Sequence, residues 1–202
     1  MSSCTDKIKE VIMPLKSSDV IFVTGNKSIF HKLIGWFTRT RDEPKTIAKH
    51  VAGMLNEAMV IEALWRVTKT SSNEWFNTHE NFEVWRNKSL SSEDRVEIAS
   101  KVVEYDSNFY GFWKLFLHGA DLLVEKIVNR QFYFFRKIMF SEDYPICSWL
   151  WALPYYKKAG ISFGTSYRWA DPDSMRDHVS KSDEWEMVHK ISNGNVAVNR
   201  LK

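Results

Sequence analysis

Two apolar, β-rich runs that lie close together in the sequence restrict the fold more than any other feature. They span residues 50–55 (HVAGML) and 59–68 (MVIEALWRVT), and Asn56, Glu57 and Ala58 separate them. Two such runs joined by a short polar turn are typical of a β-hairpin, because so short a connection allows only antiparallel neighbours. The chain is therefore expected to contain an antiparallel sheet that includes this hairpin.

The remaining pattern places strands early in the chain and helices late. The run at 20–23 is rich in β-branched and aromatic residues, and residues 82–87 and 185–191 predict two further strands. Helices are expected at residues 5–15, 28–38, 91–105, 110–128, 147–160 and 170–179. Strands and helices that are segregated in this way indicate an α+β fold. The length of 202 residues predicts a single domain over 1–202, with a core at about 15–191.

Composition and charge exclude several classes of protein. Hydrophobic residues make up 44% of the chain, which argues against disorder. The net charge is only +3 and opposite charges alternate, so we expect no nucleic-acid partner. No apolar run is long enough for an integral membrane segment, and the first residues lack a signal-peptide core, so the expected location is cytoplasmic. Nothing in the pattern specifies an oligomeric state.

Three polar residues occupy positions where the local pattern favours apolar side chains. His50 opens one strand of the hairpin, Glu62 lies inside the other, and Cys147 lies at the expected start of a helix. Only two cysteines are present, Cys4 and Cys147, which fits a reducing compartment and leaves Cys147 available for chemistry. An imidazole and a helix N-terminus activate a thiol, and a carboxylate orients the imidazole. The hairpin brings Glu62 close to His50 if both side chains point to the same face.

Each of these residues also has an ordinary structural interpretation. Cys147 fits a small buried residue, His50 a core histidine bonded to backbone, and Glu62 the exposed edge of a sheet. The three residues also have the chemistry of a zinc site. However, the sequence contains no HExxH and no Cys-x-x-Cys, so we expect no metal and no other cofactor.

A series of short motifs follows the order found in a known family. It begins with an Asp-Val-Ile-Phe strand, continues through a Thr-ended helix, a His-Val strand and a Val-Ile-Glu-Ala strand, and ends with a Cys-Ser helix start and an Asp-Pro helix start. The matching segments are 19–22, 34–38, 49–53, 60–63, 147–148 and 171–173. In this order the chain resembles the circularly permuted NlpC-type papain-like cysteine hydrolases, particularly the YiiX/YebB-like group, over residues of about 15–180.

The resemblance implies a fold and a set of roles. It implies a small antiparallel sheet packed against helices, with the nucleophile Cys147 at a helix N-terminus, His50 as its base and Glu62 orienting His50. The backbone N–H of Cys147 would be one oxyanion donor, and Tyr144 is a candidate for another, with a buried structural tyrosine as the alternative. The sequence departs from the family at Lys49 and Ala52, and the Cys147 helix carries Trp149, Trp151 and Pro154, of which the proline should kink or shorten it.

The implied activity is hydrolysis or acyl transfer at an amide or ester bond through a thioester. The related families act on cell-wall peptides or, like relatives of lecithin:retinol acyltransferase, on lipids, so the expected partner is a peptide or lipid-like substrate. Four tryptophans could line a groove for it: Trp36, Trp65, Trp75 and Trp85. The alternative is a non-catalytic ligand- or lipid-binding module on the same fold.

Overall fold

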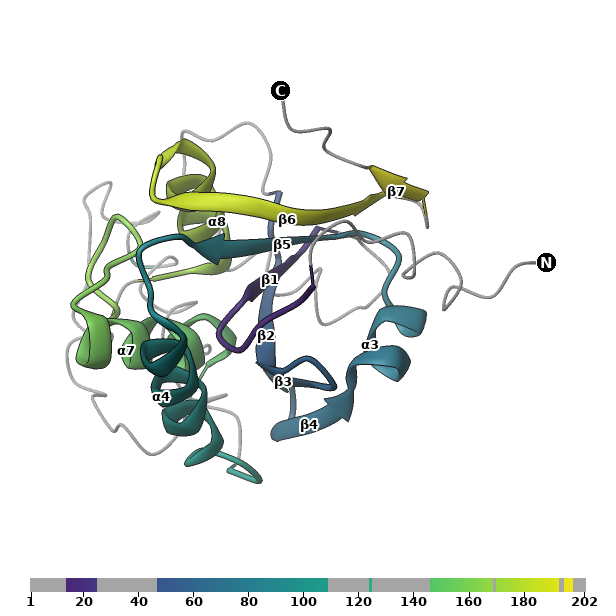
Figure 1. The fold of residues 1–202 in the computed structure, drawn as a ribbon, viewed down its shortest axis with the longest axis horizontal. Helices are drawn as coiled ribbons and strands as arrows, with labels where there is room; N and C mark the ends of the chain where they lie inside the picture. Colours follow the sequence, from purple (N-terminus) through teal and green to yellow (C-terminus); the bar gives the residue numbers. More distant parts are fainter. Residues whose placement is uncertain are drawn as a thin grey trace.

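The chain forms an antiparallel sheet with helices on both faces (Figure 1). The computed structural model describes residues 14–24, 47–108, 124, 146–168, 170–192 and 195–197. Within these ranges the seven strands are β1 (Val20–Val23), β2 (His50–Asn56), β3 (Met59–Ala63), β4 (Val67–Ser71), β5 (Phe82–Asn87), β6 (Trp185–Ser192) and β7 (Asn195–Ala197). Their order across the sheet is β4-β3-β2-β1-β5-β6-β7. The helices described are α3 (Ser72–Thr78), α4 (Ser92–Val103), α7 (Cys147–Ala159) and α8 (Pro172–Lys181).

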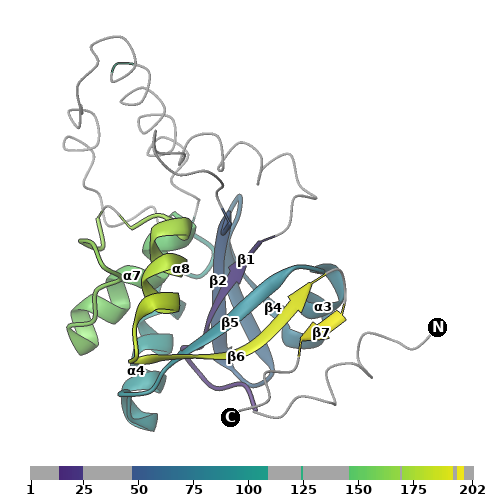
Figure 2. The ribbon, with the colours of Figure 1, turned by 90° about the horizontal axis from the view of Figure 1, so that it is seen from above.

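The two faces of the sheet are covered by different helices. Figure 2 shows α4, α7 and α8 on one side of the strands and α3 on the other. On the α7 side, Val51 and Ile61 pack with helix residues such as Leu150, whereas on the α3 side Ala52 and Met54 pack around Trp75 and Phe76. Successive strand residues alternate between these two cores, which is why the central strands are apolar on both faces.

The predicted hairpin is present as β2 and β3. Asn56 pairs with Met59, so Glu57 and Ala58 form a two-residue turn, and the Asn56 side chain accepts a hydrogen bond from the Ala58 N–H at 2.9 Å. This Asx-type bond closes the turn locally. The antiparallel sheet and the α+β class predicted from the sequence are therefore confirmed.

The sheet has more strands than predicted, in part because one expected strand is divided into two. The run at 59–68 divides at residues 64–66 into β3 and β4, and β4 leads directly into α3, which the sequence pattern did not predict. The tail after Ser192 contains β7, which pairs with β6 and which the sequence pattern did not predict. The helices expected at 5–15, 28–38 and 110–128 lie outside the described residues, except for residues 14–15, which are not helical, and residue 124, which is helical.

Helix α7 begins and ends as the sequence predicts. It starts at Cys147 and stops at Gly160, whose φ of 67° is the left-handed conformation that glycine adopts easily. Pro154 was expected to kink or shorten this helix, but the helix continues through it to Ala159. The proline does not end the helix because the buried residues around it keep the segment packed against the sheet.

Gly53 lets α7 approach β2 closely. A Cβ atom at Gly53 would overlap the indole ring of Trp151, so the glycine makes room for this bulky side chain. Trp151 is fully buried and lies one helical turn after Cys147. Gly53 and the bulky Trp151 therefore fit each other, and together they set the distance between α7 and β2.

We expect Gly53→Ala to lower the free energy of unfolding by about 1–3 kcal/mol, because the added methyl group overpacks the contact with Trp151. Urea unfolding measures this loss. The matched test is the double variant with Trp151→Phe, which removes part of the overlapping ring. The double variant should lose less than the sum of the two single losses. Additive losses would show that the two residues do not constrain each other.

A buried charge cluster fixes the start of β1. Asp19 is fully buried and accepts two hydrogen bonds from Arg86 of β5, one from Nε at 2.8 Å and one from Nη2 at 2.6 Å. The Nη1 atom of Arg95 on α4 lies 3.7 Å from the same carboxylate. Two-point pairing of this kind fixes geometry as well as charge. The Asp19 that opens the Asp-Val-Ile-Phe motif thus has a structural role here.

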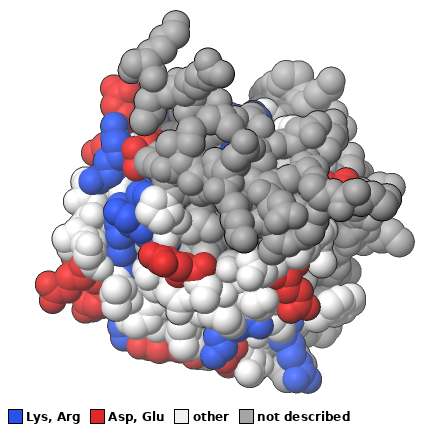
Figure 3. Space-filling view, turned by 45° about the vertical axis from the view of Figure 1, so that its right-hand side comes forward, with Lys and Arg blue, Asp and Glu red and all other residues white. Residues whose placement is uncertain are grey.

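The exposed surface carries mixed charge. On the face drawn in Figure 3, Lys and Arg side chains are interspersed with Asp and Glu over the described part of the chain. Lys158 and Glu97, for example, form an ion pair between α7 and α4. No helix in the described ranges is both long enough and apolar enough to cross a membrane.

Candidate functional site

His50 and Glu62 form a buried pair near the open end of the hairpin, away from its turn. The Nε2 atom of His50 lies 2.8 Å from Oε2 of Glu62, and the two residues are 0% and 4% exposed. The register explains the contact: Ala52 is directly opposite Glu62, and His50, two residues from Ala52, points to the same face. The contact predicted from the hairpin is therefore present.

Trp75 is a third member of the site that sequence reasoning did not assign to it. Its indole Nε1 donates a hydrogen bond to Oε1 of Glu62 at 2.9 Å, so both carboxylate oxygens have a buried donor. Trp75 lies on α3, whose N-cap Ser71 accepts a hydrogen bond from the Glu74 N–H. The spacing of Ser71 and Glu74 is a helix-start signal that could have revealed this helix.

The Trp75 ring also packs against the side chain of His79. It stacks on the His79 ring with centroids 3.9 Å apart and planes 9° from parallel. The Nδ1 atom of His79 donates to the Trp75 carbonyl at 2.9 Å. Burial, opposed by this bond, holds the pKa of His79 below its usual range. His79 therefore contributes mainly by packing against the indole that orients Glu62.

Cys147, the predicted nucleophile, also interacts with His50. It is 2% exposed and is the first residue of α7, with Ile146 as N-cap. Its side chain interacts with the His50 imidazole, and this interaction raises the pKa of His50. His50 is the first residue of β2, so this contact joins the start of a helix to the start of a strand. The structure thus brings Cys147, His50 and Glu62 together.

The electrostatics of the site favour charged side chains. Burial alone would lower the pKa of His50, but its hydrogen bonds and charge interactions with Cys147 and Glu62 raise the pKa to about 10. Burial would likewise raise the pKa of Glu62, yet the bonds from His50 and Trp75 hold it below its usual range. Both shifts favour the charged forms, the imidazolium of His50 and the carboxylate of Glu62.

The arrangement is a linear chain of groups. Glu62 is hydrogen-bonded to Nε2 of His50, and the Cys147 side chain interacts with the same imidazole ring. A metal requires its ligands to converge on one point, whereas here the imidazole lies between the other two groups. In the described ranges, no cluster of three or more His, Cys, Asp or Glu side chains is arranged to hold a metal ion. The residues present fit proton transfer better than metal binding.

These features define an α+β protein with a seven-stranded antiparallel sheet in its described part and a buried Cys-His-Glu chain. No protein-family model matches the sequence, and no curated protein matches it significantly. Among solved structures, the chain is similar to the metalloprotein YiiX from Escherichia coli O157:H7, with 17% sequence identity and a TM-score of 0.51. The match covers 90% of each chain. At this identity the likeness shows a shared fold.

The structure describes only some of the other residues that the sequence predicted for the site. Tyr144, the candidate oxyanion donor, and Cys4 and Trp36 lie outside the described residues. The proposed tryptophan groove is not formed by Trp75 and Trp85, because both are buried, at 1% and 7% exposure. Trp65 is 68% exposed. Trp75 has a polar role instead, as the donor to Glu62.

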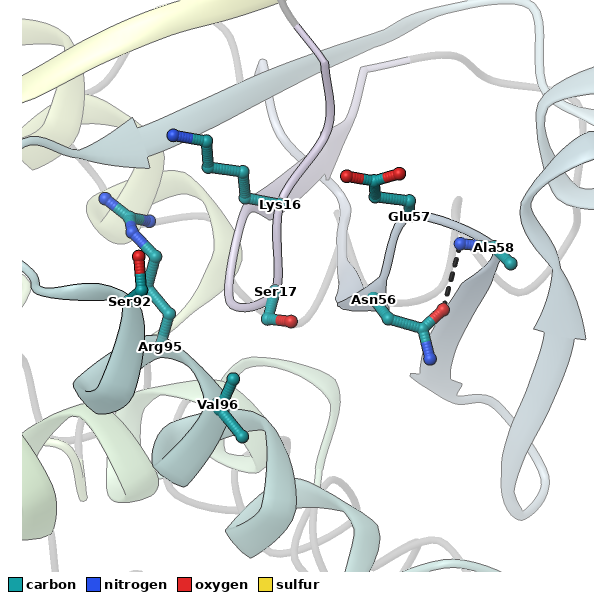
Figure 4. Close-up of a pocket in the computed structure, with 8 residues that line it drawn as sticks. All are labelled: Lys16, Ser17, Asn56, Glu57, Ala58, Ser92, Arg95 and Val96. Carbon is teal, nitrogen blue, oxygen red and sulfur yellow. Dashed lines mark hydrogen bonds between the residues drawn. The ribbon is translucent and has the colours of Figure 1, made fainter.

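A pocket of about 500 Å³ lies away from this chain of groups (Figure 4). It is lined by Lys16, Ser17, Asn56, Glu57, Ala58, Ser92, Arg95 and Val96. Asn56 ends β2 and His50 begins it, so the pocket lies at the opposite end of this strand from the site. The candidate site is therefore distinct from this pocket.

We expect Trp75→Phe to reduce stability at neutral pH by about 1.5–3 kcal/mol, because Glu62 loses a buried donor. The folded pKa of Glu62 is depressed, so its contribution is present above its ordinary value of 4.5 and is lost as the pH falls through the folded value. The difference between variant and parent should therefore shrink in acid. Urea unfolding at pH 7 and pH 4 measures it. Trp65→Phe, at an exposed position, is the control and should show no such pH dependence.

Proposed function

We propose that this protein is a cysteine-dependent hydrolase or acyltransferase of the circularly permuted NlpC-type papain-like class, acting on an amide or ester bond. One observation carries the proposal: the buried His50 is hydrogen-bonded to the carboxylate of Glu62 and interacts with the side chain of Cys147. A nucleophile, a base and an orienting acid in this order are what acyl transfer through a thioester needs. The shared fold with YiiX and the motif order in the sequence support the same class.

In the first half of the reaction, His50 holds the thiol proton and the Cys147 sulfur attacks the substrate carbonyl carbon. A sulfur–carbon bond forms and the carbonyl π electrons move onto oxygen. When the tetrahedral intermediate collapses, the bond to the amine or alcohol breaks and His50 returns the proton to that leaving group. In the second half, His50 takes a proton from water or an acceptor alcohol or amine, which attacks the thioester and releases Cys147.

The start of α7 supplies stabilisation for the oxyanion. As the first residue of the helix, Cys147 has a backbone N–H outside the intrahelical ladder, at the positive end of the helix dipole. This N–H serves as one oxyanion donor, and Tyr144 remains the candidate for a second. Glu62 keeps its charge throughout and fixes His50 in the orientation that faces the sulfur.

The substrate class follows from the family resemblance: a cell-wall peptide or a lipid-linked amide or ester. The name of the neighbour YiiX includes the word metalloprotein, but the linear arrangement of donors here does not fit a metal, so no step uses one. The rival function is a non-catalytic ligand- or lipid-binding module. The complete Cys147, His50 and Glu62 set favours the enzyme, because a binding module has no need for an imidazolium beside a thiol.

A screen of amide and ester substrates tests the proposal, with release of the amine or alcohol as the readout. The panel contains short peptides with D-amino acids, acyl-chain amides and acyl-chain esters. Turnover should be lost in Cys147→Ala, and mass spectrometry of the intact protein should trap the acyl group on Cys147 with a slowly hydrolysed ester. Binding of a panel member without turnover or acylation would support the binding module instead.

A further inference from the structure

Asp173 is a buried carboxylate that none of the steps above uses. It lies in the first turn of α8 and is 8% exposed. Its Oδ1 atom accepts hydrogen bonds from the backbone N–H groups of Ile47 at 2.8 Å and Ala48 at 3.0 Å. Its own N–H donates to the N-cap residue Asp171 at 3.0 Å, which fixes Asp173 at the helix start. A buried carboxylate thus holds two backbone groups that are distant in sequence.

The segment that Asp173 holds leads directly into His50. After Ile47 and Ala48, the N–H of Lys49 donates to the Val23 carbonyl at 2.9 Å, and His50 pairs with Val23 across β1 and β2. Three successive N–H groups before His50 are therefore fixed, two of them by Asp173. A single oxygen atom of Asp173 accepts both bonds, so it fixes the two N–H groups relative to each other and to α8.

We propose that Asp173 is a positioning residue for His50, fixing where the chain enters β2 and so where the imidazole stands between Cys147 and Glu62. The inference rests on the proposed function, because it assigns Asp173 to the same acid–base chain. Displacement of a catalytic group by about 1 Å costs up to a hundredfold in rate, so an anchor three residues from the base has a measurable effect. An alternative in which Asp173 only stabilises α8 predicts loss of stability without a change at Cys147.

The test measures the pH dependence of Cys147 alkylation by iodoacetamide, with each thiol followed separately by peptide mass spectrometry. Asp173→Ala removes the acceptor, whereas Asp173→Asn keeps an oxygen that accepts both N–H bonds. Val179→Ala is the matched control, because Val179 is fully buried on the same helix and its side chain has no hydrogen-bonding group. The midpoint of the alkylation profile should rise by about one pH unit in Asp173→Ala and stay near the parent value in Asp173→Asn and Val179→Ala.

The outcomes separate this inference from the proposed function. If the His50→Ala variant has the same alkylation profile as the parent, His50 does not activate Cys147 and the proposed function is wrong. If His50→Ala shifts the profile but Asp173→Ala does not, or Val179→Ala shifts it equally, the positioning role is wrong. If Asp173→Ala does not fold, amide hydrogen exchange in the parent protein tests the anchor instead. The amides of Ile47 and Ala48 should then be protected as strongly as those of β2. Rapid exchange at these two amides would overturn the inference.

Discussion

Iodoacetamide should modify Cys147 at a pH about two units below that required for Cys4, when each profile is scaled to its own plateau. The reason is the imidazolium of His50, which a pKa of about 10 keeps charged beside the sulfur across neutral pH. A charged partner of this kind stabilises the thiolate, and the start of α7 adds to the effect. Scaling to the plateau removes the influence of burial on the absolute rate.

His50→Ala provides the control for this prediction, because it removes the imidazolium and keeps the helix start. The Cys147 profile should then move to that of an ordinary thiol, close to Cys4. At high pH the parent should also change, since His50 loses its proton as the pH rises through about 10. If Cys147 and Cys4 follow the same profile in the parent protein, the thiol is not activated and the proposed function fails.

Glu62→Gln should reduce turnover on the order of a thousandfold while the protein stays folded. In the parent, Trp75 donates to one carboxylate oxygen and His50 to the other. A glutamine offers one oxygen and one NH₂ group, so one of these donors meets another donor. If the oxygen faces Trp75, the NH₂ group donates to Nε2 of His50, and the imidazole proton moves to Nδ1. The histidine is then in the wrong tautomer to act as base.

Glu83→Gln is the matched control for Glu62→Gln. Glu83 is also a buried glutamate, 2% exposed, and is bound to Arg176 and Lys190, each at 2.9 Å. The same substitution there should lower the melting temperature and leave turnover unchanged. The ¹⁵N chemical shifts of the His50 ring report the tautomer without any substrate. Normal turnover and an unchanged tautomer in Glu62→Gln would reject the orienting role.

The central part of the fold could be predicted because its signals are local. The hairpin required only two apolar runs and a short turn, and its register placed His50 and Glu62 on one face. The starts of α4 and α8 were visible because capping residues lie within a few positions of each other in the sequence. In both helices the structure has a capping box, at Ser91 and at Asp171.

The parts that the sequence did not reveal depend on contacts between distant residues. The donor from Trp75 to Glu62 requires α3 to lie on the face of the sheet opposite α7, and no local pattern specifies that face. The fit between Gly53 and Trp151 likewise joins two elements far apart in the chain. Similarly, residue types alone suggested Cys147, His50 and Glu62 as a set, but the pairing of Cys147 with His50 rested mainly on the family resemblance. Patterns of burial and capping could not supply their contact.

The separation of the site along the chain has a consequence for how it forms during synthesis. His50 and Glu62 lie 12 residues apart and pair within one hairpin, so the contact between the base and its acid joins residues that are close in the sequence. Cys147 arrives much later and meets His50 only when α7 has docked on β2. Partly synthesised or misassembled chains therefore hold no activated thiol. Low-pH reactivity of Cys147 therefore reports one long-range step of folding, the docking of α7, and timed alkylation can follow it in a refolding experiment.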